Sequence, residues 1–139
     1  MTWENPTNEE VANILQTSKT IAVVGLSDNP ERTSYQISKA MQDAGYKIIP
    51  VNPKVEEVLG ERAYRSLEEI EEQIEIINVF RRSEYLLDIA KEALHTNANV
   101  FWAQQGVINE DAYKLLKENE FTVIMDLCIK VAHAVLPRN

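Results

Sequence analysis

The sequence predicts a single α/β domain of three layers, with a parallel sheet of about five strands. Short apolar runs rich in β-branched residues alternate with segments of helical periodicity, which is typical of a parallel sheet covered by helices on both faces. The chain has 139 residues, 45% of them hydrophobic, enough for one core without a disulfide. These features together indicate a Rossmann-like fold. The expected strands are residues 19–24, 46–51, 75–80, 98–102 and 121–125.

Helices are expected between these strands. A Thr or Ser followed three residues later by Glu is a capping box, and it begins a helix at residue 7 and a short helix at residue 66. Residues 1–17 are therefore an N-terminal helical extension of a domain that spans residues 1–139. Residues 62–64 are a candidate edge strand. Apolar residues at helical spacing predict further helices at residues 34–44, 83–94, 109–118 and 129–136.

Composition and charge argue against several classes of partner and indicate a cellular location. The net charge of -8 disfavours nucleic acid and anionic membranes, because both bind positive surfaces. The N-terminus is polar and acidic, unlike a secretory signal, and no apolar run approaches the roughly 20 residues of a membrane span. The single cysteine, Cys128, excludes an intrachain disulfide and suits a reducing, cytoplasmic location. No pair of candidate ligands has metal-binding spacing, so no metal site is expected.

Ligands of open parallel sheets bind outside the carboxyl ends of the strands, where the strand order reverses. The segments that follow the expected strands are residues 25–34, 52–54, 80–83 and 103–106. The first of these begins with a glycine and leads into a helix, whose N-terminal N–H groups suit a phosphate. Arg32 could add a bidentate contact to phosphate oxygens, and Arg81 and Arg82 follow the third strand. The alternative is that these arginines are surface residues in salt bridges.

The second strand ends without the usual acid. A dinucleotide-binding protein carries Asp or Glu about 20 residues beyond its glycines to hold the ribose hydroxyls. Asn52 and Pro53 occupy that place here, which argues against a nicotinamide cofactor. Asn52 could still bond to adenine or ribose, or the pair could be only a turn.

In their order, these motifs resemble the family of stand-alone coenzyme A-binding domains, which is similar to the CoA-binding domain of the succinyl-CoA synthetase α subunit. The resemblance covers residues 17–136. It rests on Gly25-Leu-Ser27 with Arg32 and Ser34, Val51-Asn-Pro53, Val79-Phe-Arg-Arg82, Phe101-Trp-Ala-Gln-Gln-Gly106, and Met125-Asp126 with Cys128.

The resemblance implies a ligand, coenzyme A or an acyl-CoA, and a set of contacts. Gly25, Ser27, Arg32 and Ser34 would hold phosphates. The adenosine site would be lined by Val51, Asn52 and Pro53, the ligand flanked by Phe80 and Arg81, and the pantetheine arm bordered by Trp102, Gln104 and Gly106. For Trp102, a place in the core is the alternative.

The expected function is a non-catalytic binding, carrier or sensor module, without excluding an enzyme. No catalytic residue is predicted, because Cys128 and His133 are five residues apart and do not face each other on a helix. A separate hypothesis is that Cys128 forms a mixed disulfide with the ligand thiol under oxidation. An NAD(P)-linked oxidoreductase, another nucleotide-binding protein and an interaction subunit with an empty pocket are the alternatives. The partner is then a small nucleotide ligand, with a homo-oligomer or a protein partner also open.

Overall fold

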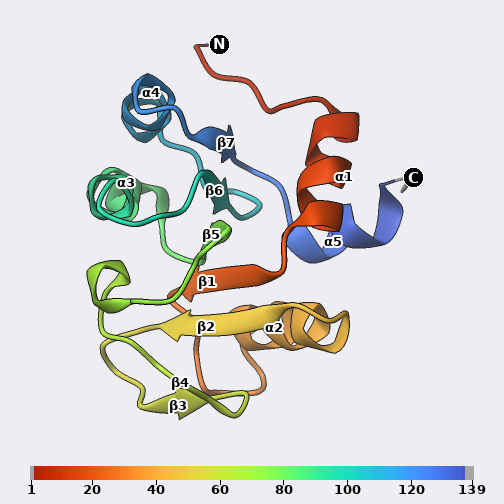
Figure 1. The fold of residues 1–139 in the computed structure, drawn as a ribbon, viewed down its shortest axis with the longest axis vertical. Coiled ribbons are helices and arrows are strands. Elements are labelled where there is room, and N and C mark those ends of the chain that lie inside the picture. Colours follow the sequence, from red (N-terminus) through yellow and green to blue (C-terminus); the bar gives the residue numbers. More distant parts are fainter. Residues whose placement is uncertain (1, 137–139) are drawn as a thin grey trace.

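A computed structural model describes residues 2–136 of the chain. Its centre is a five-stranded parallel sheet with the order β2-β1-β5-β6-β7 (Figure 1). The strands of this sheet are β1 (Thr20–Val24), β2 (Lys47–Val51), β5 (Ile76–Val79), β6 (Val100–Ala103) and β7 (Thr122–Ile124). The helices are α1 (Asn8–Thr17), α2 (Thr33–Asp43), α3 (Leu86–Ala93), α4 (Glu110–Glu118) and α5 (Ile129–Val135). Shorter elements are the hairpin of β3 (Glu57–Val58) and β4 (Glu61–Arg62), and the 3-10 turns η1 (Leu67–Glu69) and η2 (Ser83–Tyr85).

Helices cover both faces of the sheet, as the alternation of strands and helices predicts. Figure 1 shows α3 and α4 on one face and α1, α2 and α5 on the other. Alternate residues of β1 serve the two cores: Ala22 packs towards α3 and α4, whereas Ile21 and Val23 pack with residues of α1, α2 and α5. Every helix within residues 2–136 falls short of the length and hydrophobicity that a bilayer span requires.

The predicted elements are confirmed in number and order for the main sheet, with three local differences. The capping box of Ser66 and Glu69 is present, but it opens only the turn η1, because Ile70 returns to an extended backbone. The predicted edge strand at residues 62–64 is a short hairpin, after which Tyr64 forms a parallel bridge with Val51. The helix expected from residue 83 begins with the 3-10 turn η2.

The strand order defines where a ligand can enter. From β1 the chain moves to β2 on one side, and later strands β5, β6 and β7 are added on the other side. The order reverses between β1 and β5, which is the topological switch point at which such sheets bind ligands. Gly25 follows β1 and Phe80 follows β5, so these two residues stand at that point.

The N-terminal segment passes along the outer edge of the sheet. Trp3 packs against the core beneath α3 and α4, whereas α1 lies on the opposite face. Between them, the Asn5 side chain donates from Nδ2 to the Met125 carbonyl (2.9 Å) and accepts at Oδ1 from the Met125 N–H (2.8 Å). Figure 1 shows this segment running from the side of α4, past β7, to α1.

Candidate functional site

Two adjoining cavities open at the carboxyl ends of the strands, on either side of the switch point. Thr33 and Phe80 line both cavities and so form the boundary between them. The first cavity has a volume of about 440 Å³ and is lined by Gly25, Ser27, Glu31, Arg32, Thr33, Ser34 and Phe80. The second has a volume of about 810 Å³ and is lined by Thr33, Phe80, Arg81, Arg82, Ser83, Gln104, Gln105, Gly106, Val107 and Cys128. We call these the α2 cavity and the distal cavity.

The loop between β1 and α2 shapes the α2 cavity. Gly25 has a φ of +86°, and its N–H donates to the Val51 carbonyl at 2.9 Å. The Ser27 N–H donates to Ser34 Oγ and the Asn29 N–H donates to Ser27 Oγ, both at 3.0 Å. Both hydroxyl groups are acceptors inside the loop, so each keeps its own O–H to donate to a bound anion.

The N-terminus of α2 points its unpaired donors at the same cavity. Arg32 is the N-cap residue, its side chain makes no capping hydrogen bond, and the first turn holds no acid. A helix start without a capping side chain leaves backbone N–H groups for a ligand. The Arg32 side chain is exposed and forms no ion pair with any residue in the part of the chain that the structure describes. The lining of the α2 cavity therefore combines unpaired N–H donors and the Arg32 guanidinium with one carboxylate, Glu31.

A buried hydrogen-bond network supports the distal cavity. Gln104 is 5% exposed; its Nε2 donates to Asn78 Oδ1, and its Oε1 accepts from the Ile129 N–H (3.3 Å). On the opposite wall, Ser83 Oγ accepts from the Ile108 N–H (2.9 Å). The loops that follow β5, β6 and β7 are thus joined to one another through side chains.

Asp126 belongs to a motif that carries the resemblance, but the sequence analysis predicts no contact for it. It has a φ of +57°, uncommon for a residue other than glycine, and its Oδ1 accepts from the Gly106 N–H at 2.7 Å. This bond fixes the loop after β6 against the loop after β7. Its position just after a buried strand and its place in the Met125-Asp126 motif are the signals by which the sequence could have indicated this role.

Most of the predicted contact residues lie at these cavities. Those that line the α2 cavity are Gly25, Ser27, Arg32, Ser34 and Phe80, and those that line the distal cavity are Phe80, Arg81, Gln104 and Gly106.

The residues predicted for an adenosine site line neither cavity. The Val51 side chain is 4% exposed and lies in the core beneath α3 and α4. Asn52 Nδ2 donates to the Leu26 carbonyl (3.0 Å), and its Oδ1 accepts from the Lys54 N–H (2.9 Å). Asn52 therefore braces the turn that contains the exposed Pro53.

Trp102 requires a correction. The sequence predicts that it borders the pantetheine arm, with the core as the alternative, and the structure buries its side chain completely. Its indole N–H donates to the Leu127 carbonyl at 2.8 Å. Trp102 lies behind the cavity wall, where it holds the segment that carries Cys128.

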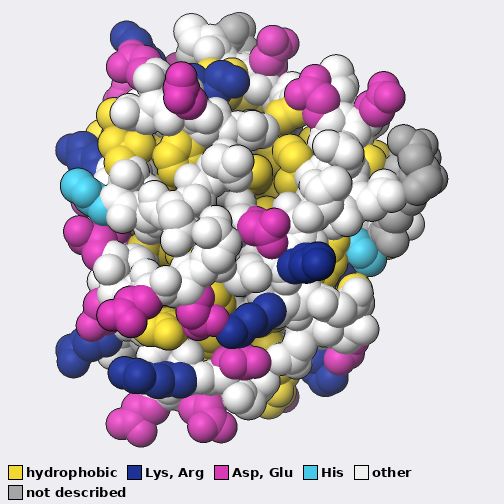
Figure 2. Space-filling model, viewed as in Figure 1, with side chains coloured by type: hydrophobic (Ala, Val, Ile, Leu, Met, Phe, Trp, Pro, Cys, Tyr) yellow, Lys and Arg dark blue, Asp and Glu magenta, His cyan; other side chains and the backbone are white. Residues whose placement is uncertain are grey.

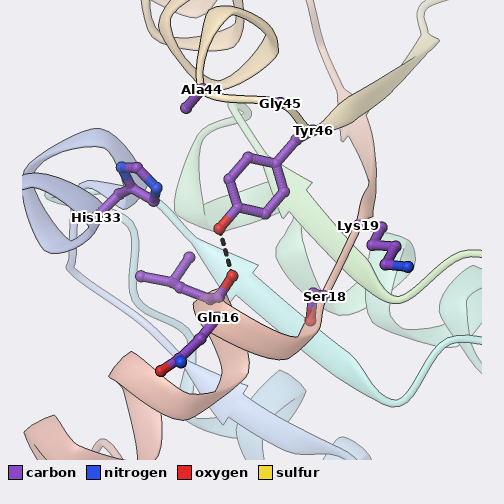
Figure 3. Close-up of a pocket in the computed structure, with 8 residues that line it drawn as sticks. Gln16, Ser18, Lys19, Ala44, Gly45, Tyr46 and His133 are labelled. Atoms are coloured by element: carbon purple, nitrogen blue, oxygen red, sulfur yellow. Dashed lines mark hydrogen bonds between the residues drawn. The ribbon is translucent and has the colours of Figure 1, made fainter. Parts of the chain in front are cut away.

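A smaller cavity of about 230 Å³ lies at the opposite, amino end of β1 and β2. Figure 3 shows Tyr46 and His133 side by side there; their rings meet edge to face, with centroids 5.6 Å apart. The Tyr46 hydroxyl donates to the Leu15 carbonyl, the dashed contact of Figure 3. These contacts join α1, the end of α2 and α5. Within residues 2–136, no group of three or more His, Cys, Asp or Glu side chains is placed to hold a metal ion.

Comparison with known proteins shows the family to which the chain belongs. A family model described as a CoA binding domain matches residues 19–134, which include both cavities. The chain belongs to the CoA-binding domain family.

Relatives of this CoA-binding domain protein differ in how much of their length they share. It is 65% identical over 132 residues to the uncharacterised protein YneT of Bacillus subtilis, covering 95% of this chain and 98% of that one. A hypothetical protein from Pyrococcus horikoshii has a solved structure with a TM-score of 0.91 and 34% identity, covering 94% of this chain and 92% of that one. The ADP-forming acetate–CoA ligase of Methanocaldococcus jannaschii is 34% identical over 58 residues, which are 42% of this chain and 8% of the ligase.

Proposed function

We propose that this protein binds coenzyme A or an acyl-CoA across the α2 cavity and the distal cavity, as a binding, carrier or sensor module. The observation that carries the proposal is the pair of cavities that meet at Phe80 and Thr33, at the switch point of the sheet. CoA has a charged pyrophosphate in its middle and an uncharged pantetheine arm. These two parts match two adjoining cavities, one of which offers hydrogen-bond donors and the other apolar surface. Membership of the CoA-binding domain family supports the same ligand.

The α2 cavity is suited to the pyrophosphate. The backbone N–H groups at the start of α2 and the hydroxyls of Ser27 and Ser34 can donate hydrogen bonds, and the Arg32 guanidinium adds charge. Gly25 contributes only backbone atoms to the wall of this cavity. Each charge-assisted hydrogen bond here is worth about 1.5–3 kcal/mol.

The distal cavity is suited to the pantetheine arm. Phe80 and Val107 provide apolar surface, while the exposed Gln105 provides an amide that can pair with the amides of the arm. Cys128 also lines this cavity. Neither cavity is lined by a histidine, and Glu31 is the one carboxylate among their lining residues. Because general acid–base catalysis needs such side chains, their small number supports a binding role rather than catalysis.

Isothermal titration of the ligand-stripped protein tests the proposal, with CoA, dephospho-CoA and NAD run in parallel. We expect CoA to bind, and Arg32→Gln to weaken its binding by roughly ten-fold or more while the melting temperature is unchanged. Arg65→Gln is the matched control, because Arg65 is also an exposed arginine but lies outside both cavities. Binding of NAD alone, or no effect of Arg32→Gln on CoA affinity, would overturn the proposal.

A further inference from the structure

The distal cavity carries a charge that a neutral pantetheine arm does not explain. Two arginines, Arg81 and Arg82, line it, and its lining residues include no acid. The chain as a whole has 22 acidic and 14 basic residues, and on the face shown in Figure 2 carboxylates and cationic side chains are interspersed. A cationic cavity without acids is therefore not what the composition alone would produce.

Arg81 is held in place by an aromatic ring rather than by an acid. Its guanidinium carbon lies 4.6 Å from the centroid of the Tyr85 ring, a cation–π arrangement. Within residues 2–136, Arg81 takes part in no ion pair, so its charge is not neutralised. A guanidinium stacked on a ring keeps its N–H groups, which lie in the plane, free for an anion.

Arg82 has a different environment beside it. It forms an exposed ion pair with Glu84 (3.3 Å), its side chain lies 5.6 Å from the Tyr85 ring centroid, and it can donate to the Tyr85 hydroxyl (3.4 Å). Tyr85 thus orients both guanidinium groups from the turn η2. Of the two arginines, Arg81 is the one that forms no ion pair within residues 2–136.

We infer that Arg81, stacked on Tyr85 beside Arg82, forms a second anion subsite of the bound ligand, separate from the α2 cavity that receives the pyrophosphate. This inference rests on the proposed CoA-binding function. Because the distal cavity is the one assigned to the pantetheine arm, the anion is a carboxylate at the far end of an acyl chain. A carboxylate offers two oxygens to the guanidinium fork of Arg81.

The test is a comparison of matched ligand pairs on the full chain. One pair is CoA and dephospho-CoA, which differ by the ribose phosphate. The other pair is S-(3-carboxypropyl)-CoA and S-propyl-CoA, stable thioethers that differ by one carboxylate. Affinities are measured by titration calorimetry for the wild type and for Arg81→Gln, Arg32→Gln and Arg62→Gln.

Arg62 is the matched control for Arg81. It is also an exposed arginine over a tyrosine, with its guanidinium carbon 5.7 Å from the Tyr64 ring centroid, but it lines neither cavity. We expect Arg62→Gln to leave all four affinities unchanged. Arg32→Gln should weaken all four ligands equally, because all contain the pyrophosphate.

Arg81→Gln should weaken S-(3-carboxypropyl)-CoA about ten-fold more than S-propyl-CoA, which lacks the carboxylate. A loss selective for CoA over dephospho-CoA would overturn the acyl carboxylate and assign Arg81 to the ribose phosphate instead. An equal loss for all four ligands, or no loss, overturns the subsite. A wild type that binds none of the four refutes the proposed function itself, which is a distinguishable result.

Discussion

Gly25 lies directly against the backbone of Phe80. A Cβ placed on Gly25 would stand 2.8 Å from the Phe80 carbonyl oxygen and 3.0 Å from Arg81 Cδ, closer than real Cβ contacts. The carbonyl cannot move away easily, because the Phe80 N–H donates to the Val24 carbonyl at 2.9 Å. The two sides of the switch point can meet this closely only when residue 25 has no side chain.

Gly25→Ala should therefore lower both stability and CoA affinity. Alanine at a φ of +86° is strained by about 1–2 kcal/mol, and the contact with Phe80 adds to that cost. Gly60→Ala is the control: its φ is +77°, but nothing lies within 4 Å of the added Cβ. Urea unfolding should show a larger loss of unfolding free energy for Gly25→Ala. Equal losses in the two variants would refute the close contact.

Ligand binding should protect Cys128 from alkylation. Cys128 is half-buried, lines the distal cavity and is the one cysteine of the chain, so the label reports on a single position. We expect saturating CoA to slow the reaction with iodoacetamide several-fold, as measured by mass spectrometry over time. Saturation with NAD serves as the control. A rate unaffected by bound CoA would place the pantetheine arm elsewhere.

Trp102→Phe should loosen the segment that carries Cys128. The substitution removes the donor to the Leu127 carbonyl and leaves space in the core, at a cost of about 1–3 kcal/mol in unfolding free energy. Because Leu127 precedes Cys128, alkylation of the free protein should become faster. Trp3→Phe is the matched control, since Trp3 packs on the other core. An unchanged alkylation rate in Trp102→Phe would argue against this supporting role.

The ion pair of Lys47 and Glu72 should contribute a small, pH-dependent stabilisation. The hydrogen bond with Glu72 raises the pKa of Lys47 above its ordinary value of 10.5 and outweighs desolvation, which lowers it. A pKa raised by folding means that the stabilisation is complete below the unfolded pKa and is lost as the pH rises through the folded pKa.

Lys47→Gln should accordingly lower the free energy of unfolding at neutral pH by less than about 1 kcal/mol, because both side chains are partly exposed. The difference from the wild type should shrink above pH 10.5 and in high salt. Lys39→Gln, which removes the more exposed pair with Asp43, provides the comparison in urea titrations. A difference that persists at high pH would contradict the linkage.

The sheet could be predicted from the sequence because each strand is a short apolar run between turn residues. In this fold the ligand edge follows from strand order, so the loops after β1, β5 and β6 could be predicted as well. The face of the sheet to which each strand residue points could not be predicted. A strand buried on both sides gives no alternation, so the sequence does not indicate whether Trp102 points into a core or towards the ligand.

Other details depended on partners distant in the chain. Asn52 appears free in the sequence, but Leu26 and Lys54 engage its amide once β1 and β2 are adjacent. The partner of Asp126 could not be predicted, because Gly106 is 20 residues away and follows another strand. Such contacts are decided by the register of neighbouring strands, which a single sequence does not contain.

The bond pair between Asn5 and Met125 has a consequence for self-association. A strand at the border of a sheet offers unpaired peptide groups that can template the addition of a strand from another molecule. By satisfying both the N–H and the carbonyl of Met125, Asn5 occupies the place where such growth beside β7 would begin. One amide side chain of the N-terminal segment thus takes the hydrogen bonds that a strand added from another molecule would need at this residue.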